Sequence, residues 1–278
     1  MKKRFFITFV CILALAFSSC STLQKRMVRP LPPQAELSQI LDSITQEGYR
    51  LYFSERANWV ATDLVFEKYD LDILGSSISW QPNDTVWHVV FFDKNNENSL
   101  LECHFYINSN KIVTNDSVRP ITNLEKELLQ RKETMLNEAI SKHGKDMTFA
   151  PQSFGNPNID IVCLNDKLTR VYFLQGTIKH NVIPFGNDYS VDFDENLTPI
   201  AFRRYHRSLI DCPTKSEKGE DVKLVFHTHL EDNPYITPTD ICNFLLYRPE
   251  NMNEFWVMSS AYNCIFVFKR DQHQIVIQ

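Results

Sequence analysis

Glycine is scarce in this chain of 278 residues. The seven glycines are widely spaced, and the closest two are Gly176 and Gly186. Dinucleotide-binding fingerprints, phosphate-binding P-loops and the Gly-x-Ser-x-Gly elbow of hydrolases all need closely spaced glycines, for tight turns and close backbone approach. The sequence therefore excludes these three kinds of site.

An excess of positive charge is also missing. The net charge is −5, and the Lys and Arg residues are scattered along the chain. A protein that binds nucleic acid neutralises phosphates with a basic surface, so no nucleic acid partner is expected. The apolar content of 43% is enough to bury the core of one large domain or the cores of two ordinary ones.

The chain has no Cys-x-x-Cys pair. C-terminal to residue 20, an odd number of cysteines remains, namely Cys103, Cys163, Cys212, Cys242 and Cys264. This pattern fits neither a disulfide framework nor a zinc site made of cysteines. We expect most of these side chains to be small buried groups, and one disulfide stays open as an alternative in an oxidising compartment.

The N-terminus has the features of a secretory signal. Basic residues 2–4 precede an apolar run from Phe5 to Phe17, and Ser18, Ser19 and Cys20 follow it. The run is too short to span a bilayer comfortably as a permanent helix, and a basic start with small residues after the run is typical of a segment that is removed. We therefore predict a signal peptide over residues 1–20.

Cys20 follows small residues directly, and this resembles the lipobox of bacterial lipoproteins, although Phe17 stands where leucine is usual. The resemblance implies that the thiol of Cys20 is acylated and that Cys20 begins the mature chain. The alternative is ordinary cleavage near Ala14 and Ala16, which would leave Cys20 unmodified. The predicted partner of the N-terminus is the membrane, reached through this lipid anchor.

Residues 21–33 contain three prolines and read as a flexible tether that holds the folded part off the membrane. Neither residue 21 nor residue 22 is acidic. By resemblance to lipoprotein sorting, this favours the outer membrane, with the folded part facing the periplasm.

Hydrophobic periodicity predicts an α+β protein. A helix is expected over residues 34–47, with Gly48 at its end, while residues 49–69 fit either a helix or a strand. Residues 78–113 alternate aromatic or β-branched runs with Asn- and Asp-rich turns, which indicates an antiparallel meander. We predict an N-terminal α+β unit over residues 34–116.

The clearest predicted helix covers residues 122–143. Thr122-x-x-Glu125 forms a capping box at its start. One apolar stripe is expected to face a core and consists of Leu124, Leu128, Met135, Leu136, Ala139 and Ile140. Further strands, a helix over residues 239–247 and two last strands follow, so we predict a second unit over residues 117–278.

The stretch "VFHTHLEDNPYITPTDI" carries the chemistry. Because alternate residues of a strand face the same way, His227 and His229 can hold one ion between their rings. Seven residues separate His229 from Thr237, and two more separate Thr237 from Asp240. Asp240 falls in the first turn of the predicted helix, where the helix dipole favours a carboxylate.

The pattern His-x-His, seven residues, Ser or Thr, two residues and Asp resembles the signature of the JAMM metalloproteases, also called the JAB/MPN family. The resemblance implies a JAB/MPN-like α/β/α domain over residues 117–278 and a Zn cofactor bound by His227, His229 and Asp240. It also implies that the hydroxyl of Thr237 helps to stabilise an oxyanion in the position where the family has serine. It is clear only from Val222 onward, and Leu230 replaces a proline that often follows the second histidine.

The sequence departs from the family at the general base. The family has a glutamate at the start of an early strand, and the matching position here falls near Thr169 or Arg170. Without a carboxylate to take a proton, hydrolysis loses typically 10²- to 10⁴-fold in rate. We predict Asp166 as the substitute base and Glu231 as the second choice.

Two other polar stretches resemble sites more weakly. His206 lies among arginines in "RRYHRSLI", which suggests an anion site or, more simply, a solvated basic strand. Asp188, Asp192, Asp194 and Glu195 partly resemble a calcium loop, but their spacing does not fit an EF-hand. Both stretches are predicted to be hairpin surfaces.

Three hypotheses about function stay open. The first is a membrane-tethered zinc hydrolase that cuts an amide bond in a peptide or protein substrate. The second is a binding lipoprotein that keeps the fold without hydrolysis. The third is a structural envelope protein in which the histidines have no chemical role.

Overall fold

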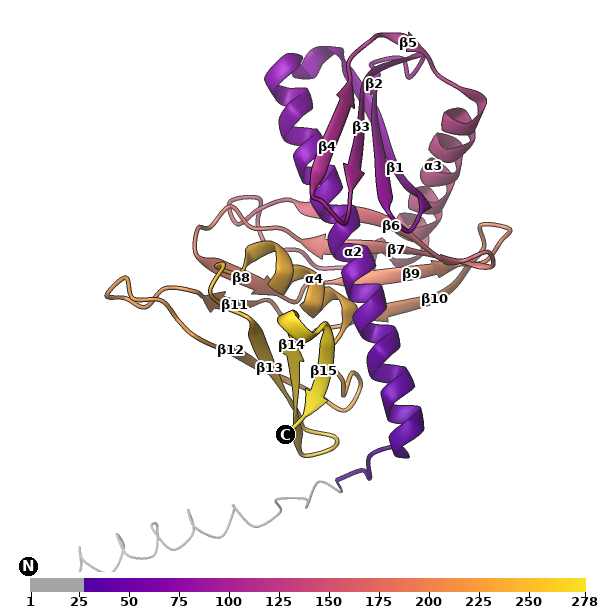
Figure 1. The fold of residues 1–278 in the computed structure, drawn as a ribbon. Helices are drawn as coiled ribbons and strands as arrows, with labels where there is room; N and C mark the ends of the chain where they lie inside the picture. Colours follow the sequence, from indigo (N-terminus) through magenta and orange to yellow (C-terminus); the bar gives the residue numbers. More distant parts are fainter. Residues whose placement is uncertain (1–27) are drawn as a thin grey trace, which may run out of the picture.

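The computed structural model describes residues 28–278, and Figure 1 shows how its helices and strands are arranged. The predicted signal peptide, Cys20 and the first part of the predicted tether lie outside the described residues. No helix within residues 28–278 combines the length and the apolar character needed to cross a bilayer.

One long helix, α2 (Gln34–Lys68), runs past the N-terminal, middle and C-terminal sheets described below (Figure 1). The helix expected over residues 34–47 does form, but the prediction that it ends at Gly48 is wrong, and the ambiguous residues 49–68 continue it. A Cβ atom at Gly48 would lie 2.7 Å from the Cβ atom of Ile241. Gly48 therefore allows a second helix to approach closely, and it caps nothing.

The N-terminal sheet has the order β1-β2-β3-β4 and is antiparallel throughout, which confirms the predicted meander. Its strands are β1 (Leu74–Asn83), β2 (Val86–Asp93), β3 (Asn98–Tyr106) and β4 (Lys111–Asn115), and the short β5 (Arg119–Pro120) also pairs with β3. Side chains on one face, including Trp87 and Leu101, pack on α2. Val90 and Phe92 on the other face pack on the next helix.

That helix, α3 (Asn123–His143), begins as predicted. Thr122 is its N-cap, and both hydrogen bonds of the capping box with Glu125 are present. The predicted apolar stripe is partly wrong, because Leu124 and Ile140 are 53% and 55% exposed. Since α3 covers the N-terminal sheet with its first turns and the middle sheet with its last turns, its buried face shifts along the helix.

The middle sheet has the order β10-β9-β7-β6 and is antiparallel. Its strands are β6 (Pro157–Asn165), β7 (Leu168–Gln175), β9 (Tyr189–Phe193) and β10 (Pro199–Arg204). Met135 and Ala139 of α3 pack on one face, next to Val171. Leu51 of α2 packs on the other face, next to Tyr172.

The C-terminal sheet has the order β12-β13-β14-β15, with β12 parallel to β13 and the other pairs antiparallel. It consists of β12 (Val225–His229), β13 (Glu254–Ser259), β14 (Cys264–Lys269) and β15 (Gln274–Ile277). Helix α4 (Pro238–Tyr247) and the ribbon of β8 (Val182–Phe185) with β11 (Ile210–Pro213) complete this region. The short strands β8, β11 and β15 were not expected from the sequence.

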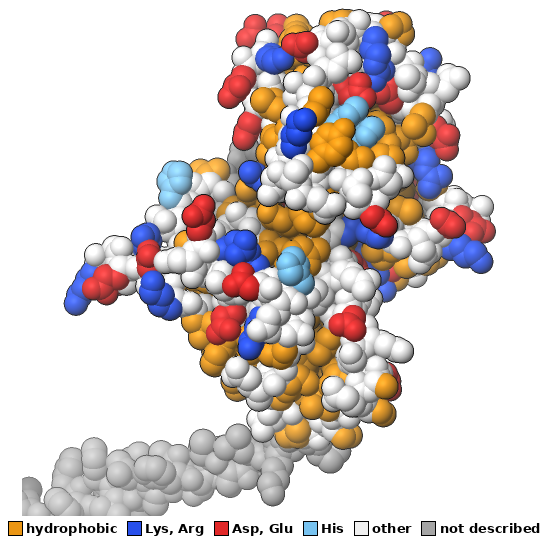
Figure 2. Space-filling view, in the orientation of Figure 1, with side chains coloured by type: hydrophobic (Ala, Val, Ile, Leu, Met, Phe, Trp, Pro, Cys, Tyr) orange, Lys and Arg blue, Asp and Glu red, His pale blue; other side chains and the backbone are white. Residues whose placement is uncertain are grey.

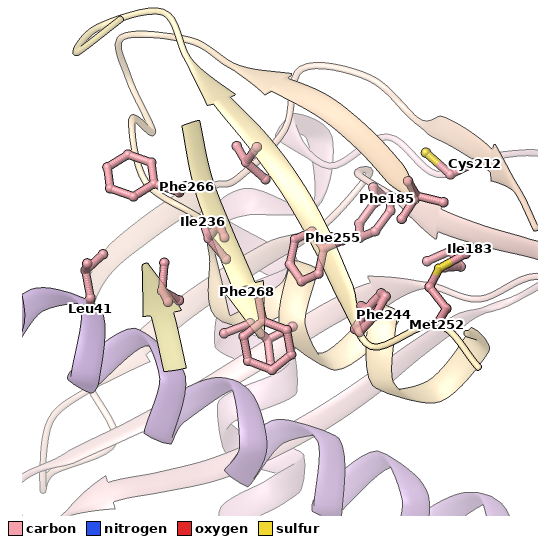
Figure 3. Close-up of a cluster of buried hydrophobic side chains, with 14 of the residues drawn as sticks. Leu41, Ile183, Phe185, Cys212, Ile236, Phe244, Met252, Phe255, Phe266 and Phe268 are labelled. Atoms are coloured by element: carbon pink, nitrogen blue, oxygen red, sulfur yellow. The ribbon is translucent and has the colours of Figure 1, made fainter. Parts of the chain in front are cut away.

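The core of this region is rich in phenylalanine. Figure 3 shows Phe185, Phe244, Phe255 and Phe268 between the C-terminal strands and α4, with Leu41 of α2 reaching in from the side. The two halves of α2 thus pack into different cores, whereas the sequence analysis placed all of residues 34–116 in one N-terminal unit. The α+β class is confirmed, while the JAB/MPN-type arrangement stays a prediction.

The described cysteines are all free, and three of them, Cys103, Cys212 and Cys242, are buried, as expected for most of the set. On the face of the molecule shown in Figure 2, charged side chains of both signs are interspersed. This distribution agrees with the scattered Lys and Arg residues of the sequence.

Candidate metal centre

The two motif histidines lie side by side on β12. Burial alternates along this strand, so that Val225, His227 and His229 are buried while Phe226 and Thr228 are exposed. The Nε2 atoms of His227 and His229 are 3.0 Å apart. The ring of His227 also packs on Phe185, with ring centroids 4.6 Å apart, so the hydrophobic core holds it in place.

Asp240 lies in the first turn of α4, as predicted. Thr237 is the N-cap of this helix, with Pro238 directly after it, and Thr237 and Asp240 form a capping box. The carboxylate Oδ2 of Asp240 accepts hydrogen bonds from Thr237 N and Thr237 Oγ1, both at 2.8 Å. This arrangement leaves Oδ1 to point elsewhere.

A third histidine completes the cluster. His206 lies two residues after the end of β10 and is 6% exposed, so the prediction of a solvated basic strand is wrong. Its Nδ1 atom lies 2.8 Å from Asp188 Oδ1. Asp188, directly before β9, is fully buried and also accepts a hydrogen bond from Thr239, so the prediction of a hairpin surface is wrong for Asp188 as well.

Four side chains converge on one point. The Nε2 atom of His206 lies 3.5 Å from that of His227 and 2.9 Å from that of His229. Asp240 Oδ1 lies 3.1 Å from His206 Nε2 and 3.2 Å from His227 Nε2, and Asp240 Oδ2 lies 3.4 Å from His229 Nε2. A tetrahedral zinc ion with bonds of about 2.0–2.1 Å holds its ligand atoms about 3.3–3.4 Å apart. The cluster therefore has the size of a four-ligand zinc site.

Protons alone account poorly for this geometry. His229 Nδ1 donates to the carbonyl of Tyr235 at 2.5 Å, so its Nε2 atom presents a single lone pair to the cluster. Two ring nitrogens, those of His206 and His227, lie within 3.0 Å of this one lone pair. Among the described residues, His227 Nδ1 makes no hydrogen bond, and the ring nitrogens that face Asp240 Oδ1 are Nε2 of His206 at 3.1 Å and Nε2 of His227 at 3.2 Å. A cation at the centre would use Asp240 Oδ1 and all three Nε2 lone pairs at once.

The electrostatics of the cluster favour a carboxylate beside neutral and positive rings. Burial opposes a charge on Asp240, but the three imidazoles lower its pKa well below the usual value. Burial also opposes a charge on His206, yet Asp188 and Asp240 raise its pKa well above the usual value. Burial lowers the pKa of His229 to about 4. In the absence of a metal, a proton on His206 is therefore the charge that balances the cluster.

One side of the cluster faces a cavity of about 660 Å³. His206 and His229 contribute to its wall, together with Arg204, Arg207 and Asn233. Asn233 donates hydrogen bonds to the carbonyls of Arg204 and Tyr205 and so fixes the segment that carries His206. The cavity gives a small ion a route to the ligand atoms.

The residues predicted as a base lie elsewhere. Asp166 is exposed in the turn between β6 and β7 and, within residues 28–278, makes no hydrogen bond or ion pair with the four clustered side chains. Arg170, where the family pattern places its glutamate, is buried and paired with Asp192 at 2.6 Å. Asp192 is thus a buried ion-pair partner, which corrects the prediction of a surface hairpin. Glu231 lies just after β12 and pairs with Arg29 at 3.6 Å.

Sequence reasoning found three of the four clustered residues, namely His227, His229 and Asp240, and missed His206. The missing signal is the pairing of β9 with β10, in which Tyr189 lies opposite Arg204, so that Asp188 and His206 meet at the end of one hairpin. An Asp before one strand and a His after its antiparallel partner, as here, would have been the pattern to seek.

No protein family, curated protein or solved structure matches this chain.

Proposed function

We propose that this protein is an envelope-anchored zinc-binding lipoprotein whose ion is held by His206, His227, His229 and Asp240 and does not serve hydrolysis. The convergence of four buried donors at zinc spacing carries the proposal. A catalytic zinc site keeps one position open for water or substrate, whereas a structural site is closed by four protein ligands. Here His206 occupies the fourth corner.

The residues behind the ligands support a permanent ion. A histidine that binds a metal usually donates its other ring N–H to a carboxylate or a carbonyl, which fixes its orientation. Asp188 accepts this hydrogen bond from His206, and the carbonyl of Tyr235 accepts it from His229. The ion would join three separate parts of the chain, namely the end of the β9–β10 hairpin, strand β12 and helix α4.

We also propose that the metal site is related to the zinc site of the JAMM family. The parallel pair of β12 with β13, and the helix α4 that follows the histidines and carries Asp240, support such a kinship. The absent glutamate and the added histidine support a descendant that kept the metal and lost hydrolysis. The anchor at Cys20 and the periplasm-facing outer membrane location rest on the sequence pattern alone.

A zinc-dependent peptide or amide hydrolase is the second candidate, and the cavity beside His206 and His229 favours it. Zinc bound there would polarise a scissile carbonyl as a Lewis acid. His206, oriented by Asp188, would then act as the proton carrier in place of the missing glutamate. In this reading the metal has three protein ligands and His206 is not one of them.

Metal analysis with variants separates the two candidates. Protein purified without chelators should contain about one zinc per chain, and X-ray absorption should give three imidazoles and one carboxylate at about 2.0–2.1 Å. His206→Ala should weaken zinc binding about as strongly as His227→Ala does. His180→Ala, at an exposed histidine, is the matched control and should bind zinc like the wild type.

The opposite results would decide against the proposal. If His206→Ala keeps its zinc and loses a measurable peptidase activity of the wild type, the hydrolase is correct. If the wild type binds no zinc, both candidates fail. Mass spectrometry of the membrane fraction should find acyl chains on Cys20, and a soluble mature protein that Cys20→Ser does not change would contradict the anchor.

A further inference from the structure

A second cavity, of about 760 Å³, lies away from the metal centre. Residues of α2, β1, α3 and β6 line it, and Figure 1 shows these elements where the N-terminal sheet approaches the middle sheet. Its lining shares no residue with the metal cluster or with the cavity beside that cluster. The volume lies within the range of about 300–1,000 Å³ that is usual for small-molecule sites.

Buried polar atoms without partners line this cavity. Glu55 of α2 is 1% exposed, and its Oε1 atom makes no hydrogen bond among the described residues, although Oε2 accepts one from Asn158 at 3.1 Å. Trp87 is 2% exposed, and its Nε1 atom also lacks an acceptor within residues 28–278. Leaving such groups unpaired destabilises the fold. A carboxyl oxygen and an indole N–H of the cavity lining therefore lack partners that a ligand could supply.

A network of fixed polar groups surrounds these two atoms. Asp160 of β6 is buried and accepts hydrogen bonds from Ser54 and, at 3.0 Å, from the amide of Asn58. Asn58 also reaches Ser79 Oγ of β1 at 3.3 Å. Side chains from three elements hold one another in place here, which gives a ligand an ordered set of donors and acceptors.

Two half-buried indole rings, Trp59 and Trp80, also line the cavity. Each ring is supported from behind, since Trp59 packs edge-on against Tyr247 and Trp80 packs on His88. A supported aromatic face can bury the apolar face of a ligand at little entropic cost. The wall thus offers flat apolar faces together with hydrogen-bonding groups.

The charges in the wall are balanced. The cavity is lined by three cations and four acidic residues, namely Arg50, Arg131, Lys132, Glu55, Asp84, Asp160 and Asp166. Lys132 donates to the carbonyl of Ser77 at 2.6 Å, and Arg50 donates to the carbonyl of Cys163 at 2.9 Å, so the protein itself uses two of the three cations. Burial and the neighbouring Asp160 raise the pKa of Glu55 well above its usual value, and burial lowers the pKa of Lys132. The site consequently suits a neutral ligand better than a strong anion or cation.

We propose that this cavity binds a neutral saccharide. A sugar ring has an apolar face, which Trp59 or Trp80 would cover, and hydroxyls that both donate and accept hydrogen bonds. Glu55 Oε1 would pair with a hydroxyl, and Trp87 Nε1 would donate to a hydroxyl or an acetamido oxygen. A fatty acid would leave the polar wall unpaired, and a phosphate would face Glu55 and Asp160.

Calorimetry and tryptophan fluorescence on the full-length protein test the proposal, in a detergent without a sugar head group. The probe is the trisaccharide of N-acetylglucosamine, and maltotriose and trialanine are compared with it. Three of the four tryptophans line the cavity, so saturable binding should change the fluorescence. Trp80→Ala should weaken binding about tenfold or more, and Trp80→Phe, which keeps an aromatic face, much less.

Controls keep the test decisive. Trp256→Ala, at a half-buried tryptophan on β13 outside the cavity, should bind the trisaccharide like the wild type. Glu55→Leu should lose binding while melting close to the wild type, because it removes a buried carboxyl group together with its one hydrogen bond from Asn158. The proposal is overturned if neither saccharide binds at millimolar concentration, if trialanine alone binds, or if Trp80→Ala and Trp256→Ala behave alike.

Discussion

At the scale of single residues, the candidate metal centre depends on a carboxylate that is not itself a ligand. Asp188 is fully buried and accepts hydrogen bonds from His206 Nδ1 and from the hydroxyl of Thr239. A ring fixed in this way presents Nε2 to the cluster without needing to reorient. The same carboxylate makes His206 a better donor to a cation, because it stabilises the positive charge that the ring shares with the metal.

Asp188→Asn is therefore expected to weaken zinc binding by about 10- to 100-fold, the usual effect of removing such a supporting carboxylate. The amide can still accept a hydrogen bond from His206, so the fold should be retained. Competition with a chelating dye measures the affinity, and circular dichroism checks the fold.

Asp166→Asn is the matched control, since it makes the same chemical change at an exposed carboxylate. It should leave the zinc affinity unchanged. Equal affinities for wild type and Asp188→Asn would show that His206 does not need its carboxylate, and a loss in Asp166→Asn would restore that residue to the site.

At the scale of secondary structure, two helices connect the sheets. Helix α2 places Leu41 in the C-terminal core, Leu51 against the middle sheet and Ala61 against the N-terminal sheet. Helix α3 covers two of these sheets and begins at a capping box whose glutamate, Glu125, also pairs with Arg119 at 2.7 Å. The start of α3 is thus tied to the N-terminal sheet through one buried carboxylate.

The stability that Glu125 supplies should depend on pH. Although burial opposes a charge there, Arg119 and Thr122 lower the pKa of Glu125 to about 2. A lowered pKa stabilises the fold above the unfolded pKa of about 4.3. This contribution is lost as the pH falls through the folded value. Glu125→Gln should cost about 1–3 kcal/mol near pH 7, and urea unfolding should show the difference shrinking between about pH 4.5 and pH 2.

Glu138→Gln is the control on the same helix. Glu138 is 45% exposed and pairs with Lys142 at 3.1 Å, one turn further along. Exposed pairs of this kind contribute about 0.5 kcal/mol or less. If the two variants lose similar stability at neutral pH, the capping box and Arg119 stabilise the fold no more than an exposed ion pair does.

At the scale of the whole molecule, the proposed zinc ion acts as a cross-link between segments distant in sequence. It would join the β9–β10 hairpin of the middle sheet to β12 and α4 of the C-terminal region. Hydrogen bonds from Asn233 to the carbonyls of Arg204 and Tyr205, and from Thr239 to Asp188, cross the same boundary. An ion that binds only the folded state stabilises it by an amount set by its concentration relative to Kd.

Removing the metal should consequently lower the melting temperature. At a free zinc concentration about 100-fold above Kd the ion adds about 2.7 kcal/mol. In a chain of this size that corresponds to roughly 5–10 °C. Differential scanning calorimetry before and after chelation measures the shift, and added zinc should reverse it.

The His227→Ala variant provides the control, because chelation should not change its melting temperature. A wild-type protein that melts at the same temperature with and without chelator would show that the cluster is held by hydrogen bonds and protons alone.

The sequence by itself determined the features that depend on near neighbours. Alternation along β12 placed His227 and His229 on one face, the capping box set the start of α3, and the helix expected after the histidines put Asp240 in the first turn of α4. The turn residues between short strands gave the antiparallel meander. Each of these depends on spacings of a few residues, which local backbone geometry converts directly into position.

The tertiary structure alone decided which distant residues meet. Strand pairing brought Asp188 and His206 together and then against β12, so a histidine that looked solvated became the fourth member of the cluster. Helix α2 continues through Gly48, where α4 packs closely against it, although the local sequence pattern predicted the end of the helix there. Both outcomes follow from the packing of segments far apart in the chain, where burial overrides local propensity, and no local pattern records which segments those are.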